Sequence, residues 1–213
     1  MLAAVAIALT LSVPVARTDG VGPRVEDLRV LGGPDGAPDA IAVRGAVKVE
    51  VISGIPGVTV SVEAEQNLQA MVRTVVERGV LRIETVGDPI SVKGITARVT
   101  VPKLSRLSAT GAAQVTAPLR GACTIEVSGA AQMRLSGAPE AVTIVARGAA
   151  SLDARQLSAE RITVALDGAA EVDLGPSDAL LVTGRGVGRV RYRGTPTVST
   201  DVGPSVKVTR LRT

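Results

Sequence analysis

The chain has 213 residues, a formal net charge of +4 and an apolar content of 46%, values typical of a folded globular protein. It has one Cys and no His, which excludes an intrachain disulfide and a metal site built from thiolates and imidazoles. Its basic residues are dispersed among 20 acidic ones, and Phe and Trp are absent, so no nucleic-acid partner is expected.

Residues 1–16, MLAAVAIALTLSVPVA, carry no charge and are mostly apolar. The stretch is too short to span a bilayer comfortably, but it suits the apolar part of a secretory signal peptide cleaved near Ala16. We therefore expect export to the periplasm, the cell envelope or the extracellular space, and not an integral membrane protein. Residues 17–40 are rich in Gly, Pro and Asp, a composition that predicts a flexible lead-in.

Residues 41–104 alternate apolar and polar side chains, the pattern of half-buried strands. The alternation is clearest at residues 47–54, 58–65, 80–86 and 95–104. Pro102 should end the last of these strands, because proline cannot donate a hydrogen bond within a sheet. Residues 65–79 have some helical character, but their Val-Val pair and Thr74 favour a strand.

Residues 105–213 repeat one short phrase at intervals of 17 to 20 residues. GAAQV, GAAQM, GAASL, GAAEV, GVGRV and GPSV begin at Gly111, Gly129, Gly148, Gly168, Gly186 and Gly203. Turn residues recurring at one phase are the mark of a solenoid. Each glycine should turn a corner at positive φ, and the small residues after it keep the corner thin enough to stack.

Aligning the repeats on their glycines also aligns their apolar residues. The fourth residue after each of the first five glycines forms one column: Val115, Met133, Leu152, Val172 and Val190. A unit this short can bury its apolar side only by stacking on the next unit as parallel strands, about 4.8 Å apart. The sequence therefore predicts an all-β fold, a parallel β-helix (β-solenoid) with about 17–20 residues per coil. The uneven coil length favours the right-handed type.

Several phrases, in this order, resemble one known family. They are VSVEAEQNLQAMVRTVVERGVLRIET, the step VTVPKLSRLSATGAAQV, and the repeats SGAAQM, RGAASL and DGAAEV. Together they are similar to the head GIN domain, a domain of unknown function described as an auto-transporter adhesin head. The resemblance covers residues 41–213 and implies a β-helical domain in an exported bacterial envelope protein. It brings no catalytic residues with it.

The alignment also predicts which outward side chains are neighbours on adjacent strands. Opposite charges meet in five pairs: Arg147 with Asp167, Asp167 with Arg185, Glu171 with Arg189, Arg134 with Asp153, and Asp173 with Arg191. Exposed pairs of this kind each stabilise by less than about 1 kcal/mol, so a solvated face with cancelling charges is the simplest interpretation. Gln114 and Gln132 are placed to form an amide ladder.

Two sharper interpretations concern the charged columns. Asp153, Glu171 and Asp173 are close enough in the alignment to hold Ca²⁺, or to act as an acid–base pair on a polysaccharide. The flanking arginines, the lack of His and the lack of an aromatic surface argue against both, so no catalytic, cofactor-binding or metal-ligating residue is assigned. Arg189, Arg191 and Arg193, with Arg185 nearby, form a positive patch that is a candidate contact for anionic groups.

We therefore expect an exported, non-enzymatic β-solenoid that serves as a binding, adhesin-like or structural module of the cell envelope. Its expected partner is an envelope glycan, another protein or a second copy of itself. Two alternatives remain open. One is a β-helix polysaccharide lyase or hydrolase that uses Asp153 and Asp173. The other is a scaffold that self-associates through an open end of the solenoid.

Overall fold

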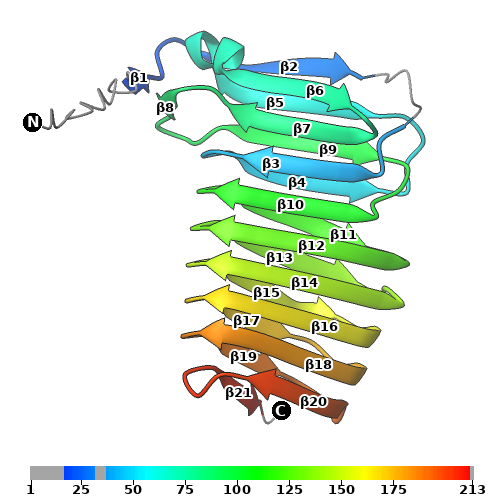
Figure 1. The fold of residues 1–213 in the computed structure, drawn as a ribbon. Coiled ribbons are helices and arrows are strands. Elements are labelled where there is room, and N and C mark those ends of the chain that lie inside the picture. The colour runs from blue at the N-terminus through cyan, green and yellow to red at the C-terminus, as the bar shows by residue number, and fades with distance from the viewer. Residues whose placement is uncertain (1–16, 32–36, 212–213) are drawn as a thin grey trace, which may run out of the picture.

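The computed structural model describes residues 17–31 and 37–211, so the predicted signal peptide at residues 1–16 lies outside the described residues. Two long sheets face each other and enclose an aliphatic core (Figure 1). The nine-stranded sheet runs in the order β20 (Thr197–Val202), β18 (Ser177–Gly186), β16 (Ala159–Gly168), β14 (Ala141–Gly148), β12 (Ala122–Gly129), β10 (Arg106–Gly111), β3 (Ala40–Arg44), β7 (Val80–Thr85) and β6 (Val72–Glu77).

The ten-stranded sheet runs in the order β2 (Arg24–Val30), β5 (Thr59–Glu65), β9 (Thr96–Val101), β4 (Lys48–Ser53), β11 (Gln114–Leu119), β13 (Gln132–Gly137), β15 (Ser151–Leu157), β17 (Glu171–Leu174), β19 (Arg189–Tyr192) and β21 (Lys207–Arg210). A short third sheet pairs β1 (Arg17–Asp19) with β8 (Asp88–Ile90). One 3₁₀ helix, η1 (Gln66–Met71), follows β5.

From β10 onward the chain alternates between the two long sheets, placing one strand in each per coil, and all neighbouring strands are parallel. The predicted β-solenoid is therefore confirmed. The register also follows the alignment on glycines, since Val115 pairs with Met133 and Leu152 with Val172. These side chains are buried, and they pack with Val, Ile, Leu and Ala from every coil into one continuous core.

The repeated glycines from Gly111 to Gly186 turn the corners of the coils at positive φ, as expected, whereas Gly203 does not have a positive φ. Gly168 has φ +115° and Gly186 has φ +100°, a region that favours glycine. Stacking adds a second constraint, because a Cβ on Gly186 would lie 2.6 Å from the carbonyl oxygen of Gly168. The column continues to Gly45 in the β3–β4 turn, which lies against Gly111 in the next coil although it has no place in the repeat phrase.

Residues 41–104 form two further coils and a cap. The β3–β4 coil lies between the β7–β9 coil and the β10–β11 coil, because β3 pairs with β7 and β10 while β4 pairs with β9 and β11. Strands β2, β5 and β6 instead make antiparallel pairs and close this end of the solenoid. Strand β9 ends at Val101, immediately before Pro102, as predicted.

Two local predictions were wrong. Residues 17–31 are not a flexible lead-in, because they contain β1 and β2, and Arg29 of β2 donates to the carbonyl oxygen of Val72 at 2.7 Å. The predicted strand at residues 65–79 begins only at Val72, and η1 precedes it. The helical turn buries Leu68 in the core and lets the Asn67 amide donate to the Asp19 carbonyl oxygen, contacts that outweigh local strand propensity.

Candidate polar binding site

The outer face of the ten-stranded sheet carries a shallow depression of about 330 Å³, here named the polar hollow. Two columns of side chains line it. One column holds Lys48, Gln114, Gln132, Ser151 and Glu171, and the other holds Thr116, Arg134, Asp153, Asp173 and Arg191, with Arg155 at the margin. Alternate residues of a strand face opposite sides, so these side chains point outward while the residues between them fill the core.

The wall of the hollow on β17 and β19 is an ion-pair network centred on Arg191. Its guanidinium donates to both oxygens of Asp173, with an Nη2–Oδ2 distance of 2.8 Å, and its Nη2 lies 2.7 Å from Oε1 of Glu171. The predicted pair of Asp173 with Arg191 is therefore confirmed. Arg189 lies at the edge of this network, 3.7 Å from Glu171, which confirms a second predicted pair. The hydrogen bonds from Arg191 to Asp173 also raise the pKa of Arg191.

Asp153, on β15, is held by two arginines. Arg155 donates Nε to Oδ1 at 2.9 Å and Nη2 to Oδ2 at 2.7 Å, and Arg134 lies 3.6 Å away, as the aligned columns predicted. The hydrogen bond from Arg155 is the main reason why the pKa of Asp153 falls to about 2. Arg155 was not among the predicted partners, because it reaches Asp153 along the same strand and not from a neighbouring coil. Its sequence signal is a spacing of two residues, which places both side chains on one face.

These contacts bear on the two sharper interpretations of the acidic residues. A general acid that works near neutral pH needs a raised pKa, whereas that of Asp153 is lowered. Asp173 and Glu171 are likewise occupied by Arg191. In the part of the chain that the structure describes, no group of three or more His, Cys, Asp or Glu is arranged to hold a metal ion. The geometry thus gives no support to a Ca²⁺ site or to an acid–base pair.

Four uncharged side chains lie in the centre of the hollow, beside Arg134 and Asp153. Gln114, Thr116, Gln132 and Ser151 are exposed and occupy three adjacent strands. Within residues 17–31 and 37–211, none of these four side chains makes a hydrogen bond to another protein group, so the predicted amide ladder between Gln114 and Gln132 is not formed. Their amides and hydroxyls are therefore available to a ligand.

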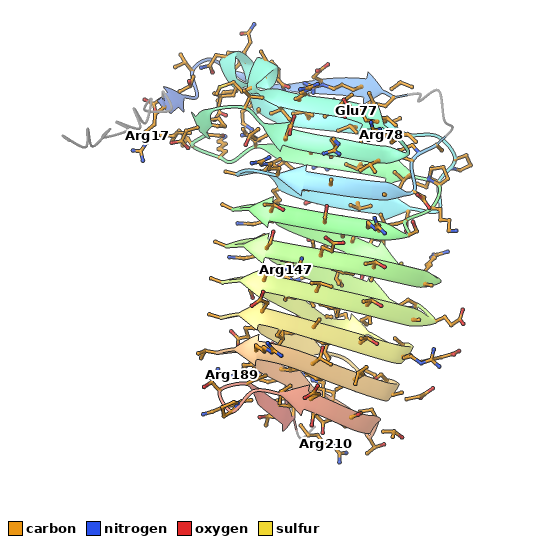
Figure 2. All side chains as sticks on the ribbon, viewed as in Figure 1. Arg17, Glu77, Arg78, Arg147, Arg189 and Arg210 are labelled. Carbon is orange, nitrogen blue, oxygen red and sulfur yellow. The ribbon has the colours of Figure 1, made fainter. Side chains whose placement is uncertain are left out.

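The remaining candidates lie elsewhere. Arg193 follows β19 and lines a second depression, of about 340 Å³, beside the polar hollow. Arg185 is at the end of β18 in the other sheet, so the four arginines do not form one patch. Arg147 and Asp167 are paired in register, as are Asp167 and Arg185, but neither pair forms an ion pair within the described residues. Figure 2 shows that charged side chains such as Arg147 and Arg189 project outward from the solenoid.

The order and spacing of these elements agree with a known family. The model of the family described as "Putative auto-transporter adhesin, head GIN domain" matches residues 37–196. The chain belongs to this family. No match was found for this head GIN domain chain among the curated proteins.

Solved structures share the fold of this head GIN domain at low sequence identity. A "putative adhesin" from Bacteroides fragilis has a TM-score of 0.71 and 14% identity, over 91% of this chain and 100% of its own. A "putative adhesin" from Parabacteroides merdae has a TM-score of 0.56 and 17% identity, over 92% and 99% of the two chains. A "putative lipid binding protein" from Parabacteroides distasonis has a TM-score of 0.54 and 15% identity, over 92% and 100%. Within the described residues, no helix has the length and apolarity required to cross a bilayer.

Proposed function

We propose that this head GIN domain is an exported, non-enzymatic, adhesin-like binding module of the cell envelope, and that its polar hollow binds a glycan. The observation that carries the proposal is the group of uncharged side chains at the centre of the hollow, where Gln114, Thr116, Gln132 and Ser151 present amides and hydroxyls without protein partners among the described residues. Such groups can both donate to and accept from sugar hydroxyls.

The charges around this centre favour a neutral ligand. The basic lining residues are Lys48, Arg134, Arg155 and Arg191, and the acidic ones are Asp153, Glu171 and Asp173. Four positive charges against three negative ones leave a net charge of only +1. The ion pairs also fix the walls, so that a ligand has to order only the uncharged side chains at the centre when it binds.

Binding without catalysis is consistent with the state of the carboxylates. Each acidic group of the hollow lies within ion-pair distance of an arginine. For Asp153 the hydrogen bond from Arg155 lowers the pKa to about 2, so this carboxylate is a poor proton donor at neutral pH. Export is supported by the uncharged, apolar residues 1–16, and a role in adhesion by the description of the family and of the neighbours from B. fragilis and P. merdae.

A binding experiment with matched variants tests the proposal. The purified domain is applied to a glycan array, and its best ligand is then titrated by calorimetry. The double variant Gln114→Ala, Gln132→Ala should lose at least about tenfold in affinity, because each lost hydrogen bond is worth about 1 kcal/mol. Thr124→Ala, Thr143→Ala is the matched control, since these residues are paired on the outer face of the nine-stranded sheet. Equal affinity of both variants would refute the assignment of the site.

A further inference from the structure

We infer that the polar hollow takes an extended, linear, neutral glycan that lies along the solenoid axis, with one sugar unit over each coil. This inference rests on the proposed function and specifies the shape and direction of the ligand. It follows from three properties of the hollow, which are its proportions, its internal repeat and the pairing of its charges.

The hollow is long along the solenoid axis and narrow along the strands. Its lining comes from six consecutive strands of the ten-stranded sheet: β4, β11, β13, β15, β17 and β19. Neighbouring parallel strands lie about 4.8 Å apart, so the first and last of the six are about 24 Å apart. Along each strand the lining covers little more than two outward positions, about 7 Å apart. An occupant that contacts the whole hollow must therefore be elongated along the axis.

The hollow also repeats. Gln114, Gln132 and Ser151 stand at the same position of successive coils, and each presents a polar end group at the interval of one coil. An extended β-1,4-linked glycan advances by roughly one coil spacing per sugar, with consecutive sugars rotated by half a turn, so each coil can receive hydroxyls from one sugar, alternately from its two edges. A compact ligand would leave most of these side chains uncontacted.

Charged side chains lie along the whole row, but each is within ion-pair distance of an opposite charge. At one end Lys48 Nζ is 2.8 Å from Oε1 of Glu50, and at the other Arg191 bridges Glu171 and Asp173. Between them, Asp153 is paired with the arginines of β13 and β15. A neutral chain can thus pass along the row without placing an unpaired charge against a sugar.

The test uses β-1,4-linked gluco-oligosaccharides and N-acetylglucosamine oligosaccharides of one to six units, which are titrated into the purified domain and followed by calorimetry. For at least one series the affinity should rise roughly threefold or more with each added unit up to about five, since each unit adds at least one hydrogen bond. Equal affinity for one and six units would overturn the axial arrangement while leaving glycan binding intact. Absence of binding by both series would also overturn it, and the array would then show whether a branched or charged glycan binds instead. Absence of binding to every glycan on the array would refute the proposed function as well.

A blocking substitution gives an independent test. Ser151→Arg places a long side chain in the middle of the row, so the hexasaccharide should bind no better than a trisaccharide, while binding of the trisaccharide is retained. Thr163→Arg is the matched control on the outer face of β16 and should leave the length dependence unchanged. The melting temperatures of both variants are measured to confirm that they fold. An unchanged hexasaccharide affinity in Ser151→Arg would overturn the inference.

Discussion

The stacked glycine corners allow a sharp test of how the coils are held together. In Gly186→Ala, the new Cβ would lie 2.6 Å from the carbonyl oxygen and 2.9 Å from the amide nitrogen of Gly168, at a φ of +100°. Backbone strain at such a φ costs about 1–2 kcal/mol, and forcing the coils apart adds about 1–3 kcal/mol. We therefore expect the free energy of unfolding to fall by about 2–5 kcal/mol in urea denaturation.

Gly57→Ala supplies the control for backbone strain alone. Gly57 has a similar φ of +91°, but a Cβ added there would have no neighbouring atom within 4 Å. Its substitution should cost only the strain contribution of about 1–2 kcal/mol. If Gly186→Ala and Gly57→Ala destabilised the protein equally, close stacking of the corners would not constrain the sequence, and the physical reason given for the glycine column would be wrong.

Three further predictions concern ionisable side chains. The pKa of Asp153 is lowered chiefly by Arg155, and this adds stability that is complete above pH 3.8 and is lost as the pH falls towards 2. In acid denaturation, Asp153→Asn should therefore lose less stability than the unchanged protein over this pH range. Arg191→Ala should lower the free energy of unfolding by about 1–2 kcal/mol and Arg189→Ala by less than about 0.5 kcal/mol, because Arg191 bridges two carboxylates and Arg189 contacts one. Equal decreases of the free energy of unfolding in urea denaturation would contradict this. Cys123 is buried and its pKa is raised by that burial, so native protein should react with a thiol reagent only after denaturant is added; rapid labelling of the native protein would refute this.

The repetitive part of the fold could be predicted because its physics is local and periodic. One glycine per coil fixes the phase, and the phase then fixes both the apolar columns and the outward neighbours, such as Arg134 beside Asp153. A register error of one residue would have placed every apolar side chain on the outside. Aligning the repeats therefore identifies both columns that line the polar hollow, but not Lys48 or Arg155.

The capping part could not be predicted in the same way, because it depends on contacts between distant, non-repeating segments. Strand β2 is held by Arg29 through residues more than 40 positions away, and η1 forms where Leu68 can reach the core. The pairing of β3 with both β7 and β10 likewise reverses the chain order of the coils. Nothing in the local alternation of apolar residues specifies such an arrangement.

The candidate site, too, could be predicted only in part from the sequence. Its columns follow from the repeat, but its chemical character depends on which charges are already paired. Arg155 neutralises Asp153 along one strand, and Arg191 neutralises two carboxylates at once. Because these charged groups already have partners, the amides of Gln114 and Gln132 are the polar groups of the hollow that remain open to a ligand.

The most direct measurement is a crystal structure of the domain soaked with a β-1,4-linked hexasaccharide. We predict sugar density along the outer face of the ten-stranded sheet, with hydrogen bonds from Gln114, Gln132 and Ser151 to successive units. Ligand density on the opposite sheet, or density that crosses the strands instead of following the solenoid axis, would contradict it.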